Sequence, residues 1–136
     1  MFSFDRLSSN IRKMLGVQRG RGYNVRCVYK VLNESEILSF VDNAQNVILD
    51  VRHEDEFEGM HVKRAINIPA NEIVSTIYNV IMDKKTPILV YCSTGERTNY
   101  AICKLTNLGY TNLYIWGNGG INTLTVREIL EFNTRV

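Results

Sequence analysis

The chain has 136 residues, of which 45% are hydrophobic and 22% are charged, and it carries a formal net charge of +2 at pH 7. This length and composition are typical of one globular domain with a sizeable buried core. No apolar stretch approaches the roughly 20 residues that a membrane-spanning helix requires. We therefore expect a single globular domain with no membrane-spanning helix and no nucleic-acid partner.

Positive charge is concentrated at the N-terminus. Residues 1–22 contain five basic residues against one acidic residue, a net charge of +4, which leaves −2 for the rest of the chain. Scattered apolar residues give this segment a loosely amphipathic pattern, and Gly20 and Gly22 indicate a flexible link. We expect a basic N-terminal extension over 1–22, flexible or amphipathic, followed by the folded domain over 23–136. Its role stays open between a solvated terminal helix, an anchor at a membrane surface and a mitochondrial presequence.

From residue 25 onward, short apolar runs alternate with segments of helical periodicity. The apolar runs predict five strands, at 25–31, 47–50, 65–68, 87–91 and 112–116. The helical segments lie at 33–44, at about 71–82, at 98–108 and at 125–132. Strands that alternate with helices form parallel sheets with helices on both faces, so the predicted fold class is α/β with a central parallel five-stranded sheet.

Local signals mark the ends and the buried faces of these helices. Asn33, with Glu36 three residues later, has the pattern of a capping box. Gly109 lies where a left-handed helix cap is expected. The residues expected to face the core recur at helical spacing: Ile37, Leu38, Val41 and Ala44, then Ile73, Val74, Ile77 and Ile81, and finally Ala101, Ile102, Leu105 and Leu108.

The chain has three cysteines, Cys27, Cys92 and Cys103. An odd number at these spacings matches neither a disulfide framework nor a zinc-ligand pattern, so no metal site is expected. Cys27 falls on a predicted strand and Cys103 inside a predicted helix, which indicates buried small hydrophobic residues. This interpretation favours a reducing compartment, and we expect the cytoplasm, or the mitochondrion if residues 1–22 are a presequence.

Cys92 lies where the apolar strand at 87–91 gives way to the helix that runs on from Thr98. In open parallel sheets, ligands bind outside the carboxyl ends of the strands, which is where this cysteine falls. Backbone N–H groups of the intervening loop can point at its sulfur, and so can the positive end of the helix dipole. Such surroundings favour the thiolate, so Cys92 is a candidate nucleophile that needs no histidine base.

Four residues separate Cys92 from Arg97, and this loop resembles the active-site loop of rhodanese-like sulfurtransferases. Further segments resemble that family in the same order, and together they cover most of the chain. They are Asp50-Val51-Arg52, Glu56-Phe57, His61-Val62, Ala65-Ile66-Asn67-Ile68-Pro69 and Trp116-Gly117-Asn118-Gly119-Gly120-Ile121. The resemblance implies a rhodanese-like fold.

The resemblance also implies a chemistry. A sulfane sulfur moves from a persulfide or thiosulfate donor to Cys92 and then to a thiol or cyanide acceptor, and a protein sulfur carrier is a further candidate partner. Cys92 and Arg97 are the expected catalytic residues, and no metal or organic cofactor is required. The expected substrate-binding residues are Ser93, Thr94, Gly95, Glu96 and Thr98. The expected structural supports of the site are Asp50, Arg52 and His61.

Some positions depart from the family pattern. Met60 stands where the family usually has Gly, and Lys63-Arg64 replaces the usual Pro-Gly, so this bend must be made differently. Ser93 occupies a position that is often basic in members that act on thiosulfate. Because Glu96 balances the charge of Arg97, thiosulfate is expected to be a poor donor.

Alternatives stay open at this point. A noncatalytic module with the same fold would bind a partner, which the unusual Lys63-Arg64 bend and the basic extension favour and the intact Cys92 loop disfavours. Dual-specificity phosphatases and arsenate reductases place five residues between Cys and Arg, but the corresponding position here is Thr98. His61 suits a general base, although its family-like place in a tight chain reversal indicates a structural hydrogen bond. Asp50 and Arg52 are most simply a charge pair at a strand end.

Overall fold

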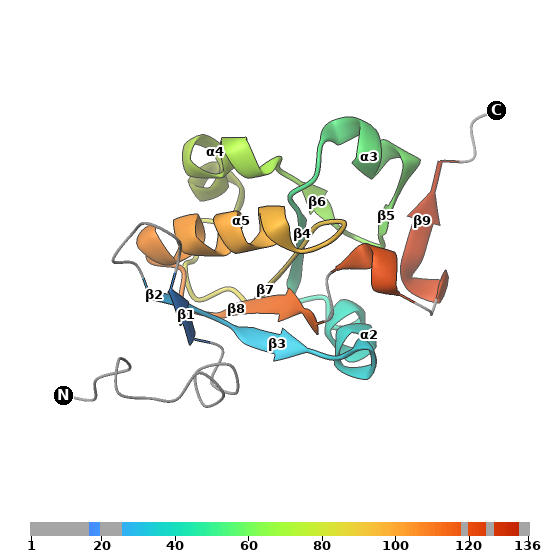
Figure 1. The fold of residues 1–136 in the computed structure, drawn as a ribbon, viewed down its shortest axis with the longest axis horizontal. Coiled ribbons are helices and arrows are strands. Elements are labelled where there is room, and N and C mark those ends of the chain that lie inside the picture. Colours follow the sequence, from blue (N-terminus) through green and yellow to red (C-terminus); the bar gives the residue numbers. More distant parts are fainter. Residues whose placement is uncertain (1–16, 20–25, 118–119, 125–126, 134–136) are drawn as a thin grey trace.

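The computed structural model describes residues 17–19, 26–117, 120–124 and 127–133. Its centre is a sheet of five parallel strands in the order β3-β8-β7-β4-β6 (Figure 1). These strands are β3 (Lys30–Leu32), β8 (Leu113–Trp116), β7 (Ile88–Tyr91), β4 (Val47–Asp50) and β6 (Ile66–Asn67). The predicted α/β class with a central parallel five-stranded sheet is confirmed.

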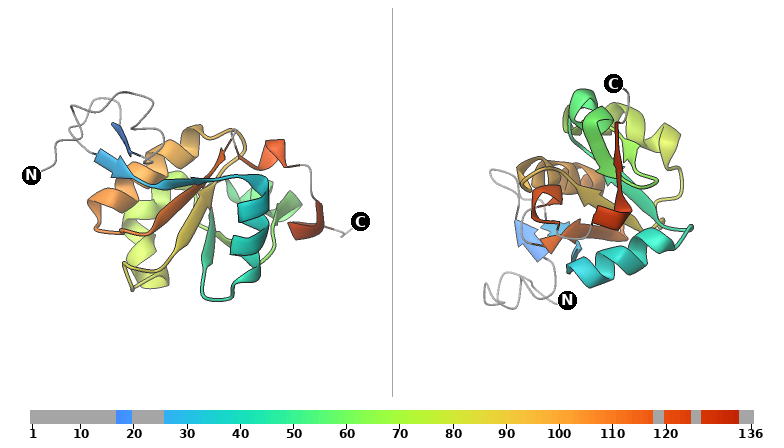
Figure 2. Two further views of the ribbon diagram at one scale, coloured as in Figure 1. Left: turned by 90° about the horizontal axis from the view of Figure 1, so that it is seen from below. Right: turned by 90° about the vertical axis from the view of Figure 1, so that its right-hand side faces the viewer.

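Helices cover both faces of this sheet. Figure 2 shows α4 and α5 on one side of the sheet and α2 on the other. The α-helices are α2 (Glu34–Asp42), α3 (Glu54–Gly59), α4 (Ile73–Val80) and α5 (Glu96–Asn107), and a 3-10 turn, η2 (Ala70–Glu72), precedes α4. Within the described ranges, none of the helices has the length and apolar character needed to cross a bilayer.

Alternation along the central strands explains why both faces are covered. Successive side chains of a strand point to opposite faces, so on β4 Leu49 joins the cluster beneath α4 and α5, whereas Ile48 joins the cluster beneath α2. All four residues of β7 are buried. A continuous apolar strand of this kind is typical of the middle of a parallel sheet, and it ends directly before Cys92.

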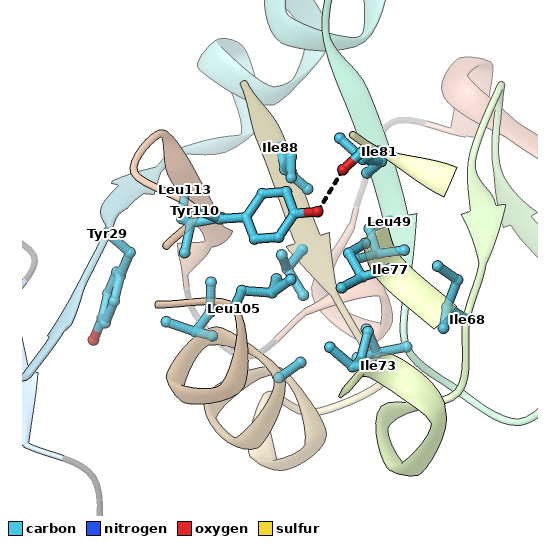
Figure 3. Close-up of a cluster of buried hydrophobic side chains, with 14 of the residues drawn as sticks. Tyr29, Leu49, Ile68, Ile73, Ile77, Ile81, Ile88, Leu105, Tyr110 and Leu113 are labelled. Atoms are coloured by element: carbon cyan, nitrogen blue, oxygen red, sulfur yellow. Dashed lines mark hydrogen bonds between the residues drawn. The ribbon is translucent and has the colours of Figure 1, made fainter. Parts of the chain in front are cut away.

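The larger apolar cluster lies between the sheet and the helices α4 and α5 (Figure 3). Ile73 and Ile77 of α4 and Leu105 of α5 are fully buried. Tyr110 closes the cluster at one end, where its hydroxyl donates a hydrogen bond to the carbonyl oxygen of Ile81 (Figure 3). Burial of one large aliphatic side chain contributes about 1.5–3 kcal/mol, so this cluster holds α5, and with it the loop that precedes α5, against the sheet.

Two predicted helix caps are present. The Asn33 side chain accepts a hydrogen bond from the Glu36 backbone at 2.9 Å, and the Glu36 carboxylate accepts one from the Asn33 backbone at 3.1 Å. This reciprocal pair is the predicted capping box. Gly109 follows α5 with a φ of +94°, the left-handed conformation expected of a glycine cap.

Two of the residues predicted to face the core are exposed. Ala44 lies past the end of α2, which stops at Asp42, so it has no helical face to share. Val74 is 57% exposed. The buried stripe of α4 runs through Ile73 and Ile77, four residues apart, and Val74 is turned by about 100° from Ile73 around the helix.

Two small antiparallel sheets accompany the central one. β1 (Val17–Arg19) pairs with β2 (Arg26–Val28), and β5 (Met60–Val62) pairs with β9 (Leu130–Phe132). The first predicted strand, 25–31, is therefore divided between β2 and β3. The predicted boundary after residue 22 falls between β1 and β2. Most of the predicted extension, residues 1–16, and the link at 20–22 lie outside the described residues.

The predicted closing helix at 125–132 is wrong. Its described part is a 3-10 turn, η5 (Arg127–Ile129), followed by the strand β9. The backbone of Lys63 donates a hydrogen bond to the carbonyl oxygen of Ile129 at 2.6 Å, and β9 continues alongside β5. Pairing with a distant strand therefore overrides the local helical periodicity.

The bend after β5 is made without the family's usual Pro-Gly. Arg64 has a φ of +66°, a left-handed conformation that is uncommon for residues other than glycine. Its side chain donates hydrogen bonds to the carbonyl oxygens of Val41 and Asn43. These contacts fasten the bend to the end of α2, and they offset the cost of the backbone conformation.

A disulfide joins Cys27 of β2 to Cys103 of α5, with 5.1 Å between the Cα atoms and a sequence separation of 76. The prediction of two unbonded cysteines is wrong, because pairing depends on distance in space and the spacing along the chain does not reveal it. Cys92 is the remaining free cysteine. Disulfides persist mainly in oxidising compartments, so the cysteine argument for a reducing compartment loses its premise, and the compartment stays a prediction.

Candidate active site

The Cys92 loop, residues 92–97, connects β7 to the first turn of α5. Gly95 has a φ of +106°, which a glycine adopts at little cost, and this turn brings its backbone N–H to the Cys92 sulfur at 2.9 Å. The helix starts at Glu96, so the sulfur faces the N-terminal end of α5. Cys92 itself is 1% exposed. The expected strand, loop and helix around this thiol are therefore in place.

Glu56 of α3 belongs to the site and was not among the predicted site residues. Its carboxylate accepts two hydrogen bonds from Arg97, at 2.6 and 3.0 Å, in a bidentate ion pair. The Ser93 hydroxyl donates to the same carboxylate at 3.1 Å, and Arg97 also donates to the Ser93 oxygen at 3.3 Å. Glu56 thus connects the two ends of the Cys92 loop.

The charge balance of the loop differs from the expected one. Arg97 is paired with Glu56, whereas Glu96, which was expected to offset it, is exposed. The hydrogen bonds from Arg97, helped by the one from Ser93, outweigh desolvation and hold the pKa of Glu56 at about 2. The same hydrogen bonds raise the pKa of Arg97. Both groups are therefore ionised at neutral pH.

A second ion pair lies at the end of β4, at the same edge of the sheet. The Arg52 guanidinium contacts the Asp50 carboxylate at 2.8 Å, with side chains that are 5% and 0% exposed, and it also donates to the carbonyl oxygen of Met60. The amide of Asn67 donates to the carbonyl oxygens of Asp50 and Arg52 at 3.1 and 3.0 Å. Burial disfavours the charge of Arg52, but the hydrogen bonds and charge of Asp50 prevail and raise its pKa. This geometry is that of a scaffold pair.

His61 has both ring nitrogens engaged in hydrogen bonds. Nδ1 lies 2.8 Å from the carbonyl oxygen of Phe57, and Nε2 lies 2.9 Å from the Glu131 carboxylate. The ring stacks on that of Phe57, with 3.9 Å between centroids. In the part of the chain that is described, these bonds run to α3 and β9 and none runs to the Cys92 loop, which matches a structural hydrogen bond better than a general base.

The remaining predicted substrate-binding residues divide into two groups. Thr94 and Glu96 are exposed at the surface of the loop. Thr98 is only 4% exposed, on the buried face of α5 that also carries Ala101 and Ile102, and its hydroxyl oxygen has no hydrogen-bond partner among the described residues. The structure therefore places Thr98 in the interior and apart from the exposed side of the loop.

The segment after β8 is hydrogen-bonded to the backbone of the Cys92 loop. The backbone of Ile121 donates to the Cys92 carbonyl oxygen at 3.0 Å, and that of Asn122 donates to the Ser93 carbonyl oxygen at 3.3 Å. Gly120 makes this approach feasible, because a Cβ there would lie 2.4 Å from the Cys92 carbonyl oxygen. Its φ of +98° also requires glycine. Gly119 of the predicted turn lies outside the described residues.

The described ranges contain no group of three or more His, Cys, Asp or Glu side chains that is arranged to hold a metal ion. The groups that the structure brings together at this edge of the sheet are a thiol, backbone N–H donors, a hydroxyl and two arginine–carboxylate pairs. Such a set suits thiolate chemistry.

Comparisons with known proteins identify the family of this chain. The family profile of the rhodanese-like domain matches residues 34–125. The chain is 31% identical over 81 residues to the thiosulfate sulfurtransferase PspE of Escherichia coli, covering 60% of this chain and 76% of that one. It is 29% identical over 87 residues to the thiosulfate sulfurtransferase GlpE of Coxiella burnetii, covering 64% of this chain and 79% of that one.

A solved structure gives the same result at the level of the fold. The crystal structure of a thiosulfate sulfurtransferase from Pseudomonas aeruginosa is similar with a TM-score of 0.67 and 27% identity, over 77% of this chain and 20% of that one. The profile match covers the central-sheet strands β4, β6, β7 and β8, the described α-helices α2 to α5 and the whole Cys92 loop. The chain belongs to the rhodanese-like domain family.

Proposed function

We propose that the protein is a sulfurtransferase that carries a sulfane sulfur on Cys92. The observation that supports this most strongly is the free thiol at the end of β7, with the Gly95 N–H 2.9 Å from its sulfur. Two relatives named thiosulfate sulfurtransferases match over more than half of this chain. The donor is a persulfide or thiosulfate, and the acceptor is a thiol, cyanide or a protein sulfur carrier.

The transfer consists of two displacements on sulfur. In the first, the Cys92 thiolate attacks the outer sulfur of the donor, the sulfur–sulfur bond of the donor breaks, and a thiolate or sulfite leaves with the electron pair. In the second, the acceptor attacks the outer sulfur of the Cys92 persulfide, and the Cys92 thiolate leaves in turn. No net oxidant is needed, and this division into two easier steps should give ping-pong kinetics.

The loop has features suited to a persulfide. The Gly95 N–H stabilises negative charge at sulfur, and the N-terminal end of α5 adds its dipole. Because Cys92 is 1% exposed, the site has little room beside the thiol. A single added sulfur atom fits such a site better than the tetrahedral oxyanion of a phosphatase or arsenate reductase. In this proposal Arg97 positions the loop through Glu56.

Intact-mass spectrometry under non-reducing conditions tests the proposal. After incubation with a sulfane donor, the wild-type chain should gain one sulfur atom, which peptide mapping should locate on Cys92. Cys92→Ser should gain none and should show no turnover. The matched control is the double variant Cys27→Ala/Cys103→Ala, which keeps the Cys92 thiol and should still take up sulfur.

The second candidate function is a noncatalytic interaction module. The exposed side chains Thr94 and Glu96 on the loop surface are the observation in its favour. A wild-type chain that gains no sulfur from any persulfide or from thiosulfate would contradict the sulfurtransferase proposal and favour the module.

A further inference from the structure

Three charged side chains surround the exposed side of the Cys92 loop. Arg97 and Glu96 belong to the loop itself, and Glu56 reaches it from α3 through the ion pair with Arg97. Together these three residues have a formal charge of −1. An anion that approaches the loop therefore meets one positive and two negative groups.

Glu56 is the stronger of the two counter-charges. Its carboxylate lies 2.6 and 3.0 Å from the two terminal guanidinium nitrogens of Arg97, and it accepts a third hydrogen bond from Ser93 at 3.1 Å. Glu96 is exposed, so solvent screens its charge more strongly. Side-chain donors of the loop are therefore directed at Glu56, where they are engaged before any substrate arrives.

The pair lies at the boundary between interior and solvent. The Arg97 and Glu56 side chains are 33% and 31% exposed, so a donor molecule in solution can experience their charges. Glu56 stays ionised far below neutral pH, because the hydrogen bonds from Arg97 hold its pKa at about 2. Its charge is thus a constant property of the site at physiological pH.

We propose that Glu56 is a specificity-determining residue: by neutralising Arg97 and engaging Ser93, it disfavours thiosulfate and favours persulfides carried on an organic thiol or a protein cysteine. This inference rests on the proposed sulfur transfer to Cys92. Glu56 acts on the choice of donor and takes no part in the bond changes at sulfur.

The physical basis is the difference in donor charge. Thiosulfate is a dianion, whereas an alkyl persulfide with a neutral side chain carries at most one negative charge. The electrostatic cost of approaching an extra carboxylate grows with the charge of the donor. Removal of that carboxylate should therefore favour thiosulfate over the persulfide by about tenfold, after allowance for solvent screening at an effective dielectric constant of about 20.

The test compares two donors on each of four chains. Steady-state kcat/KM is measured for thiosulfate and for a small alkyl persulfide with a neutral side chain, with cyanide as acceptor, on the wild-type chain and the variants Glu56→Gln, Glu56→Asp and Glu58→Gln. The readout is the ratio of the two kcat/KM values. Because both donors are measured on the same preparation, a partly unfolded variant does not change this ratio.

Glu56→Gln should raise the thiosulfate-to-persulfide ratio about tenfold at low salt, and by less as salt is added. Glu56→Asp keeps the charge and should keep the ratio within about twofold, even if both rates fall. Glu58→Gln removes the same charge from the same helix without touching Arg97, and it should also stay within about twofold.

Two outcomes overturn the inference in different ways. If the wild-type chain transfers sulfur from both donors but Glu56→Gln leaves the ratio unchanged, the sulfurtransferase proposal stands and the role of Glu56 is wrong. If neither donor adds sulfur to the wild-type chain in the mass measurement, the proposed function fails and the inference fails with it.

Discussion

Two arginine–carboxylate pairs lie at the same edge of the central sheet. They have the same chemistry, but they differ in sequence separation, in location and in exposure to solvent. Asp50 and Arg52 are two residues apart, lie at the end of β4, and have side chains that are 0% and 5% exposed. Glu56 and Arg97 are 41 residues apart, join α3 to α5, and have side chains about one-third exposed. The first pair is enclosed by the fold, and the second faces solvent beside the thiol.

The difference in exposure gives the two pairs different roles, stability for the buried pair and donor specificity for the exposed pair. A buried ion pair that loses one partner leaves an uncompensated charge in the interior, so both of its members are needed for folding. A solvent-exposed pair contributes little to stability, because water screens it. Its charges instead act on molecules that approach from solution. An arginine–carboxylate pair can therefore stabilise the fold at the end of β4, and a pair of the same kind between α3 and α5 can determine which donor is accepted.

Loss of the buried pair should have the largest effect. Asp50→Asn removes the charge that compensates Arg52 and should lower the free energy of unfolding by about 3–5 kcal/mol. Glu56→Gln, the matched change in the more exposed pair, should cost less than Asp50→Asn, because solvent screens the charge that is left behind. Urea unfolding of both variants measures the difference. Equal losses would remove the distinction between the two pairs.

Loss of the disulfide should have the next largest effect on stability. It also tests whether the conformation of the Cys92 loop depends on the contacts of the loop itself. Removal of a native disulfide typically costs about 2–4 kcal/mol, so the Cys27→Ala/Cys103→Ala variant should unfold at lower urea concentration. Hydrogen bonds to Glu56 and from the Ile121 backbone fix the loop, and the disulfide does not. Sulfur uptake by the folded variant should therefore stay near the wild-type rate, and a large fall would show that the disulfide also positions the site.

Gly120→Ala should have a smaller effect on stability and a clear one on activity. Its backbone conformation is nearly exclusive to glycine, which adds about 1–3 kcal/mol of strain. The new Cβ would also meet the Cys92 carbonyl oxygen, so sulfur uptake should fall sharply. Gly59→Ala is the control, since nothing lies within 4 Å of a Cβ there. Normal uptake by Gly120→Ala would mean that the loop tolerates a shift at this contact.

The smallest expected effect is on the pH dependence of stability. The pKa of Glu56 is lowered from 4.5 to about 2 in the folded chain, so its contribution is fully present above pH 4.5 and is lost as the pH falls toward 2. Glu56→Gln should reduce the slope of unfolding free energy against pH in that window, and Glu58→Gln should retain it. Parallel profiles for all three chains would contradict the lowered pKa.

Features encoded by neighbouring residues were predictable from the sequence. The capping box of Asn33 and Glu36 involves residues three apart, and the apolar run at 87–91 that ends before Cys92 predicts a buried strand on its own. The resemblance to the rhodanese-like family then predicted that residues 92–97 form the active-site loop. These features need only local periodicity, cap chemistry and strand-end geometry.

Features that depend on distant partners were not predictable in this way. The disulfide spans 76 residues and the Glu56–Arg97 pair spans 41. The strand β9 forms where local periodicity indicates a helix, because β5 offers it a partner about 70 residues earlier in the chain. Such contacts follow from how the sheet brings segments together, and no local pattern carries that information.

The disulfide has a practical consequence for measuring sulfur on this chain. With Cys27 and Cys103 bonded to each other, the oxidised chain has one thiol, Cys92, among its three cysteines. After denaturation without a reductant, an alkylating reagent therefore modifies one site per chain, Cys92, whether it is a thiol or a persulfide. Three equivalents mean that the disulfide has opened. This titration therefore reports the oxidation state of the scaffold, and the mass of the alkylated chain reports the sulfur carried on Cys92, with no substitution in the protein.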